Sequence, residues 1–97
     1  MIDISKIAEE NRERKEDILK AVYLLTGGLY GEPIAMGKIQ AFTPVGFGDM
    51  RFLVHLKKVF EFQHTPDTFA LTADAIAAIE AEERAAKWIK KVEEAKT

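Results

Sequence analysis

The chain has 97 residues, which suits one domain with a single hydrophobic core. Hydrophobic residues make up 47% of the sequence and charged residues 31%, so we expect a folded domain that also exposes long solvated helices. The chain has no cysteine, which excludes disulfides and cysteine-bound zinc or iron–sulfur sites. The net charge is −2, whereas dedicated nucleic-acid binders usually carry a basic excess, so any basic surface must be local.

The N-terminal ten residues become acidic almost at once and contain no apolar run of the kind that signal peptides need. No stretch of the sequence approaches the roughly 18 uninterrupted apolar residues of a membrane span. We therefore expect a cytoplasmic protein without a membrane segment.

The first 26 residues predict one long helix, with Asp3 or Ser5 as its cap. Residues 9–17 are almost wholly polar, so this section is expected to project into water or to meet a partner chain. Residues 18–25 are apolar on most sides and are expected in the core. Thr26 and the two glycines after it should end the helix, because glycine accepts the left-handed conformation.

The next section predicts two shorter helices separated by turns. Residues 29–33 predict a turn, and residues 34–36 could either form a short extended piece or enter a helix directly. Residues 36–42 predict a short helix that buries Met36, Ile39 and Phe42. After a break at residues 43–46, a further helix should open at Gly48 or Asp49 and run to about Lys58.

The last section predicts a hairpin followed by a long helix. Residues 60–63 and 68–71 alternate apolar and polar side chains, the period of strands, and residues 64–67 have turn composition. Thr72 should cap the final helix, which extends from Ala73 to about Lys96 and is rich in alanine, glutamate and lysine.

This order of elements resembles the winged helix-turn-helix family of DNA-binding domains, over roughly residues 16–82. Residues 55–59 (HLKKV) are similar to the end of a recognition helix, with Phe52, Leu56 and Val59 at the spacing that packs such a helix onto a core. Residues 69–76 (FALTADAI) are similar to a second wing strand running into a capped helix in the MarR- and PadR-like dimeric regulators.

The resemblance implies a mainly α fold with a small β-hairpin and long terminal helices, in a single domain over residues 1–97. Residues 1–15 would be an N-terminal helical extension, residues 16–82 the core, and residues 83–97 a C-terminal helical extension used for dimerisation. It also implies a homodimeric transcriptional regulator that binds double-stranded DNA. The implied DNA-facing residues are Lys38, Asp49, Met50, Arg51, Leu53, Val54, Lys57, Lys58 and His64.

The sequence departs from the family at Leu53 and Val54, which directly follow Phe52, a residue expected in the core. Leucine and valine cannot form hydrogen bonds with base edges. An alternative hypothesis is therefore a module that binds another protein, through Phe47, Met50, Leu53 and Val54, and does not bind DNA. A third hypothesis is an all-helical structural dimer without a wing.

The terminal helices carry apolar residues beyond the expected core. Ile76 and Ile79 can close the core, but a later stripe at helical spacing needs another partner surface, as do two isoleucines of the first helix. The two sets could pack within one chain or between two chains, and we favour a homodimer. The expected dimer residues are Ile4, Ile7, Ala85, Trp88, Ile89 and Val92.

No residue pattern indicates catalysis, a metal or a cofactor. His55 and His64 lie on different predicted elements without ligand spacing. The glycines at 27, 28 and 31 precede no Gly-Lys-Ser/Thr phosphate motif. The only serine is Ser5, and the paired glutamates lie on exposed helices, where carboxylates perform no proton transfer. We expect no enzyme activity.

Overall fold

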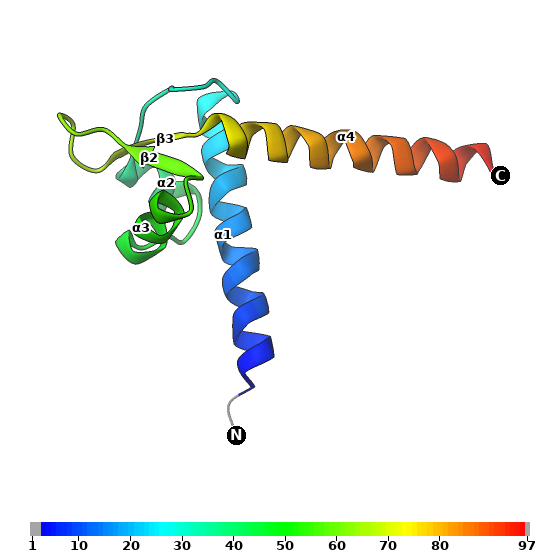
Figure 1. Ribbon diagram of the computed structural model, residues 1–97, viewed down its shortest axis with the longest axis horizontal. Helices are drawn as coiled ribbons and strands as arrows, with labels where there is room; N and C mark the ends of the chain where they lie inside the picture. The colour runs from blue at the N-terminus through cyan, green and yellow to red at the C-terminus, as the bar shows by residue number, and fades with distance from the viewer. Residues whose placement is uncertain (1–2, 97) are drawn as a thin grey trace.

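The computed structural model describes residues 3–96, so residues 1, 2 and 97 of the expected terminal extensions lie outside the described residues. The chain is mainly helical with a small three-stranded antiparallel sheet. Figure 1 shows that the two long helices leave the core in different directions, which gives an L-shaped molecule measuring 54 × 43 × 23 Å. The elements are α1 (Ile4–Thr26), β1 (Ile34–Ala35), α2 (Met36–Phe42), α3 (Phe47–His55), β2 (Val59–Glu61), β3 (Thr68–Leu71) and α4 (Ala73–Ala95).

The long first helix is confirmed. The Asp3 side chain caps it by accepting a hydrogen bond from the Lys6 amide at 3.3 Å, and Gly27 ends it in the left-handed conformation. Ile18 and Val22 are buried, as expected. Leu24 and Leu25 are exposed, however, because the sheet and the short helices cover only one side of the last turns of α1.

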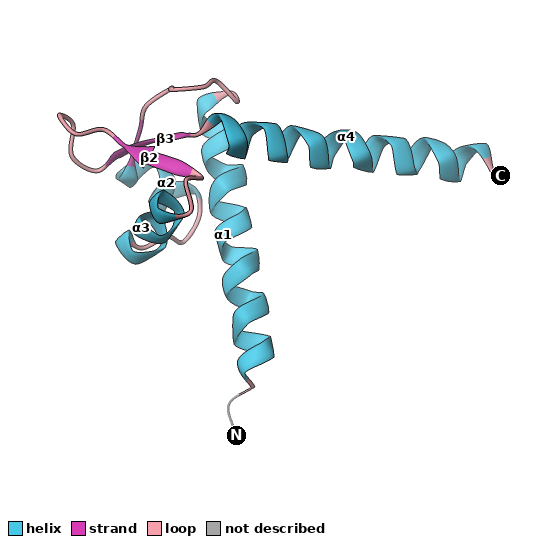
Figure 2. Cartoon of the chain, viewed as in Figure 1, coloured by secondary structure: helices cyan, strands magenta, loops and turns pink. Residues whose placement is uncertain are grey.

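The sheet has the order β1-β3-β2, and both pairings are antiparallel (Figure 2). The predicted hairpin is confirmed, although its first strand covers residues 59–61 instead of 60–63. The all-helical hypothesis is therefore wrong. Strand β3 is central and all four of its residues are buried. The alternation of polar and apolar residues predicted one solvent-exposed face for this strand, and that prediction is wrong.

Residues 34–36 adopt both of the conformations that the sequence left open. Ile34 and Ala35 pair with β3, and α2 begins at the next residue. Met36 and Ile39 are buried, as expected, but Phe42 is exposed. Each helical residue turns the side chain by about 100°, so Phe42, six residues after Met36, points away from the core at the last position of α2.

Helix α3 presents the opposite face to the core from the one that the sequence predicted. Met50 and Leu53 are 0% and 1% exposed, whereas Phe52 and Leu56 are 47% and 48% exposed. The expected packing of Phe52, Leu56 and Val59 assumed that the helix continues to Lys58. It ends at His55 instead, so Val59 reaches the core as the first residue of β2 and not as part of a helical stripe.

A tight turn explains why α3 ends early. Lys57 has a φ of 60°, the left-handed conformation, and its amide donates to the Val54 carbonyl at 3.0 Å. The Lys58 amide donates to the Leu53 carbonyl at 2.9 Å, which completes a Schellman motif. The opening of α3 is also earlier than predicted, at Phe47.

Thr72 joins α4 to the rest of the core. Its hydroxyl oxygen accepts from the Ala75 amide at 3.3 Å and donates to the Lys57 carbonyl at 2.7 Å, which confirms the predicted cap. Ile76 and Ile79 pack against the core, as expected. From Glu80 onward every described residue of α4 is exposed, so most of this helix is an arm in solvent. No helix within residues 3–96 combines the length and apolar character that crossing a bilayer requires.

Candidate nucleic-acid interface and terminal arms

The outward face of α3 is the surface that could meet DNA. At about 100° per residue, the positions opposite Met50 and Leu53 are Gly48, Arg51, Phe52 and His55, and all four are exposed. The sequence prediction included Arg51 but missed Gly48 and His55, because it placed Phe52 in the core. With Met50 and Leu53 assigned to the core, the same helical spacing would have identified them.

The three lysines and the histidine of the expected DNA-facing set divide into exposed and partly buried side chains. Lys38 on α2, Lys57 in the turn after α3, and His64 between the hairpin strands are exposed. Lys58 is partly buried because it lies beside α1 and the start of α4. Three of the four positions can therefore reach a polyanion without rearrangement.

Met50 and Leu53 are corrections to the expected DNA-facing set. Both side chains are buried in the hydrophobic core, so neither can reach a base edge. Val54 is partly buried and packs against the same core. The protein-binding patch expected from Phe47, Met50, Leu53 and Val54 is likewise not a continuous surface, because only Phe47 is exposed.

Asp49 is the third correction. One of its carboxylate oxygens accepts from Arg14 of α1 at 2.9 Å, and the other accepts from the Gly46 amide at 3.0 Å. Its side chain is only 14% exposed. Asp49 therefore orients α3 against α1 and caps α3, and it is not free to face DNA.

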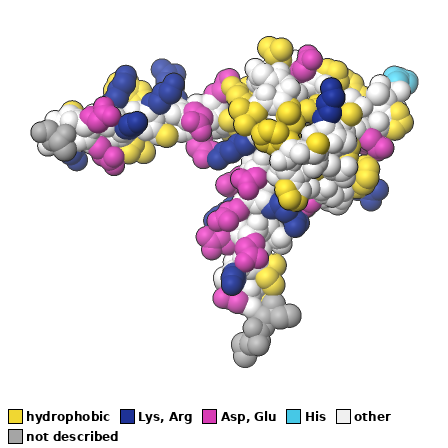
Figure 3. All heavy atoms as spheres, turned by 180° about the vertical axis from the view of Figure 1, so that it is seen from behind, with side chains coloured by type: hydrophobic (Ala, Val, Ile, Leu, Met, Phe, Trp, Pro, Cys, Tyr) yellow, Lys and Arg dark blue, Asp and Glu magenta, His cyan; other side chains and the backbone are white. Residues whose placement is uncertain are grey.

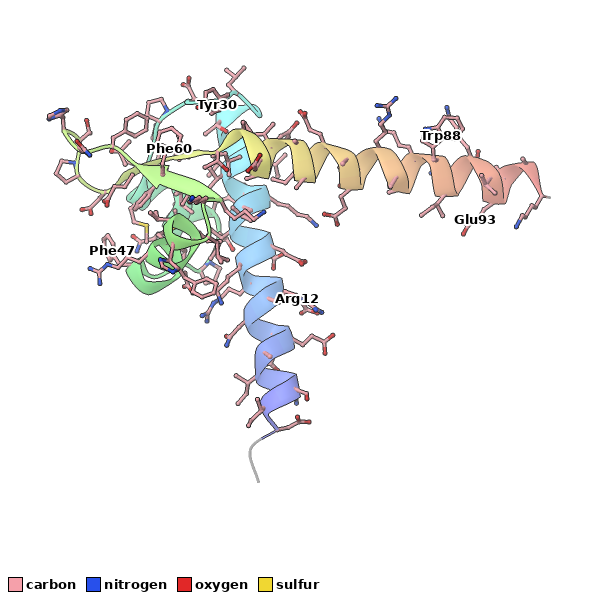
Figure 4. The ribbon with its side chains drawn as sticks, in the orientation of Figure 1. Arg12, Tyr30, Phe47, Phe60, Trp88 and Glu93 are labelled. Atoms are coloured by element: carbon pink, nitrogen blue, oxygen red, sulfur yellow. The ribbon has the colours of Figure 1, made fainter. Side chains whose placement is uncertain are left out.

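A hollow of about 180 Å³ separates α3 from the hairpin. Figure 4 shows Phe47 at the α3 side and Phe60 on the sheet. Two carboxylates, those of Glu61 and Asp67, share the hollow with Arg51, and the Asp67 amide donates to the Glu61 carboxylate at 3.3 Å. These carboxylates reduce the positive potential around Arg51. The lining residues are Phe47, Arg51, Val54, Glu61, Asp67 and Phe69.

The expected dimer residues are all exposed, but the two sets lie far apart. Figures 1 and 4 show that α1, with Arg12, and the outer part of α4, with Trp88 and Glu93, extend in different directions. The two stripes therefore do not pack against each other within one chain, which was one of the two possibilities that the sequence left open. The exposed residues are Ile4, Ile7, Ala85, Trp88, Ile89 and Val92.

A larger groove, about 520 Å³ in volume, lies between α1 and α3. Phe52 of α3 and Leu56, the residue after α3, form part of one wall, and the Lys15 ammonium lies 4.5 Å from the centre of the Phe52 ring. The sequence prediction missed this groove because it assigned both apolar side chains to the core. The α1 wall contains Ala8, Asn11, Arg12, Lys15, Glu16 and Leu19, and the α3 side adds Leu53 and Lys58.

Two polar contacts form the joint between α1 and α4. The Tyr23 hydroxyl donates to the Glu80 carboxylate at 2.8 Å, and Lys20 lies 3.6 Å from Glu82. The hydrogen bond to a carboxylate stabilises the neutral phenol and raises the pKa of Tyr23 above its ordinary value.

Within residues 3–96 no three histidine, aspartate or glutamate side chains are grouped closely enough to hold a metal ion. Comparisons of the chain with protein-family models, with curated proteins and with solved structures gave no match.

Proposed function

We propose that the protein is a homodimeric winged-helix DNA-binding protein that regulates transcription. The observation that carries this proposal is the arrangement of α3 and the β2–β3 hairpin, which are consecutive in the chain and lie side by side around a shared hollow. Arg51 and His55 are exposed on the face of α3 that is turned away from the core. A single helix with such a face fits the width of the major groove.

The exposed side chains support distinct roles on a duplex. Arg51 is placed to donate to a guanine edge, the commonest base contact of arginine, and His55 lies one turn further along the same face. Lys38 precedes α3 and Lys57 follows it, so the pair is suited to phosphates on either side of the groove. His64, between the strands, would approach the backbone of a neighbouring groove.

The charge of this surface sets the expected strength of binding. Four cations per chain, Lys38, Arg51, Lys57 and Lys58, can contribute, and Glu61 and Asp67 oppose them. Counterion release then predicts a slope of log K against log salt of about −3 to −4 per chain. We therefore expect binding that is weak at moderate salt and strengthens steeply as salt is lowered.

The test is fluorescence anisotropy with a mixed-sequence duplex at low and moderate salt. Arg51→Ala should weaken binding by roughly tenfold, whereas Lys6→Ala, which removes one cation from the far end of α1, should change it much less. Both residues are exposed, so both variants should fold. Absence of binding by the wild-type protein at micromolar concentration in low salt would end the proposal.

A protein-binding module remains the second candidate, because the exposed part of α3 is partly aromatic. Phe47 and Phe52 are each about half exposed on opposite sides of Arg51. A protein partner predicts that Phe47→Ala abolishes its capture while Arg51→Ala has little effect. DNA binding predicts the larger effect at Arg51.

A further inference from the structure

We infer that the groove between α1 and α3 binds the outer half of α4 from a second copy of this chain, with Trp88 of that copy against Phe52 and Leu56. The inference rests on the dimer in the proposed function, but it is independent of DNA binding. It also assigns a role to Phe52 of α3 and to Leu56, the residue after α3, two exposed apolar side chains that lie outside the hydrophobic core.

The first argument is the direction of the apolar stripe on α4. Ala75 and Ile79 face the core of their own chain. At about 100° per residue, the stripe centred on Trp88 and Val92 is rotated from that face by about 140°, and by nearly half a turn when Ile76, which also packs against the core, is included. The stripe is therefore not a continuation of the core contact. It points to a second body, and Trp88 is 60% exposed without one.

The second argument is distance from the joint where Tyr23 of α1 meets Glu80 of α4. Trp88 lies eight residues beyond Glu80, and Lys15 lies eight residues before Tyr23, so each is about 12 Å from the joint along its helix. By the same measure, Val92 of α4 and Asn11 of α1 lie at equal distances from the joint. Lys15 and Asn11 both line the groove, so the stripe and the groove lie at matching distances.

The third argument is symmetry. A two-fold axis that bisects the angle between the arms exchanges their directions, so the α4 of each copy lies along the α1 of the other (Figure 1). Helix α1 runs toward the joint and α4 runs away from it, so the paired helices are antiparallel. One axis therefore fills both grooves at once, and the contact closes as a dimer.

The fourth argument is charge. Residues 84–92 of α4 contain four basic residues and no acidic one, whereas residues 9–17 of α1 contain five acidic residues and three basic ones. One of these three, Arg14, is already paired with Asp49. Figure 3 shows acidic side chains gathered along the α1 arm, and basic side chains together with some acidic ones on the outer α4 arm. Of the five acidic residues only Glu16 lines the groove, where Arg12, Lys15 and Lys58 also lie, so the attraction is expected along the edges of the paired helices and not inside the groove.

The fifth argument is area. Six large exposed apolar side chains would be covered in each copy, and at roughly 100 Å² each they account for most of the about 800 Å² per partner in a stable interface. The aliphatic stems of the flanking lysines add to this area. The six are Ile7, Phe52, Leu56, Trp88, Ile89 and Val92.

The register is tested by disulfide cross-linking, for which the chain is suited because it has no cysteine of its own. Asn11→Cys combined with Val92→Cys should give a covalent dimer under mild oxidation, because the two positions meet only between copies. Glu16→Cys combined with Val92→Cys is the matched control, displaced by five residues or about 7.5 Å, beyond the reach of a disulfide. A covalent dimer from the control and not from the first pair would overturn the inference.

The assembly itself is tested by sedimentation equilibrium and by the fluorescence of Trp88, the only tryptophan in the chain. Dilution of the wild-type protein should shift the emission to longer wavelength as Trp88 becomes exposed. Phe52→Ala should raise the dimer dissociation constant at least tenfold, whereas Phe42→Ala, a comparably exposed phenylalanine outside the groove, should leave it unchanged.

Failure of this inference differs from failure of the proposed function. A protein that stays monomeric at about 100 μM, or one in which Phe42→Ala and not Phe52→Ala weakens the dimer, overturns the groove assignment even if DNA is bound. A dimer with the expected cross-link that does not bind DNA supports the groove assignment and overturns DNA binding.

Discussion

Arg14 of α1 and Asp49 of α3 form an ion pair at 2.9 Å, and the same aspartate caps the helix on which it lies by accepting from the Gly46 amide at 3.0 Å. The orientation of α3 against the long arm is therefore coupled to the start of α3 itself. A change at this carboxylate affects two structures, whereas a change at Arg14 affects only one.

We predict that Asp49→Ala lowers the free energy of unfolding by about 1–2 kcal/mol, because it removes both the cap and the ion pair. Arg14→Ala should cost less than about 1 kcal/mol, since its side chain is 50% exposed and the pair is screened by solvent. Urea denaturation of both variants measures the difference. Equal losses would show that the cap contributes nothing.

We predict that Leu53→Ala lowers the free energy of unfolding by about 2–5 kcal/mol and that Leu53→Asp does not fold. Leu53 lies in the core, where truncation leaves a cavity and a carboxylate finds no partner. His55→Ala, two residues along the same helix and exposed, is the control and should change stability little. Circular dichroism during thermal unfolding measures all three. A folded, cooperative Leu53→Asp variant would contradict this placement of α3.

We predict that Lys57→Gly raises the free energy of unfolding by about 0.5–1 kcal/mol. Lys57 has a φ of 60°, a conformation that costs a side chain roughly 1–2 kcal/mol and glycine almost nothing, although glycine loses more entropy on folding. Lys58→Gly has no such gain and should destabilise the protein. Thermal unfolding at neutral pH distinguishes the two, and a lower melting temperature for Lys57→Gly would refute the prediction.

We predict that the Tyr23→Phe variant loses less stability than the wild type when the pH is raised from 8 to 11. The pKa of Tyr23 is raised because its hydroxyl donates to Glu80, so the folded state holds this proton more tightly than the unfolded state. That contribution is fully present below the unfolded pKa of tyrosine, about 10, and it disappears as the pH rises through the folded pKa.

The measurement is the difference in melting temperature between the wild type and Tyr23→Phe at pH 8 and at pH 11. The difference should be larger at pH 8. Tyr30→Phe, the same substitution at an exposed tyrosine, is the control. If the difference in melting temperature between the wild type and Tyr23→Phe is larger at pH 11 than at pH 8, the prediction is wrong.

The features that follow from local chemistry could be predicted from the sequence. Asp3 and Thr72 cap helices because their side-chain oxygens reach amides three residues further on, and Gly27 ends α1 because it adopts the left-handed conformation. The hairpin follows from two short alternating runs around a polar turn. Each of these depends on residues that are close together in the sequence.

The orientation of α3 could not be predicted in the same way. Its sequence is apolar on several sides, and Phe52 and Met50 are both plausible core residues by hydrophobicity alone. The choice depends on the left-handed turn at Lys57, a residue type that rarely adopts this conformation, and on the ion pair with Arg14 of a distant helix. The sequence therefore does not predict the groove either, because hydrophobicity alone places Phe52 and Leu56 in the core.

The attachment of α4 through Thr72 has a mechanical consequence. The helix has 23 residues and is about 35 Å long, but only its first two turns rest on the core. A tilt of about 10° at its base would therefore carry its far end through roughly 6 Å. The Thr72 hydroxyl also donates to the carbonyl of Lys57, two residues after the end of α3, so a displacement of the α4 tip is transmitted to the turn that ends α3.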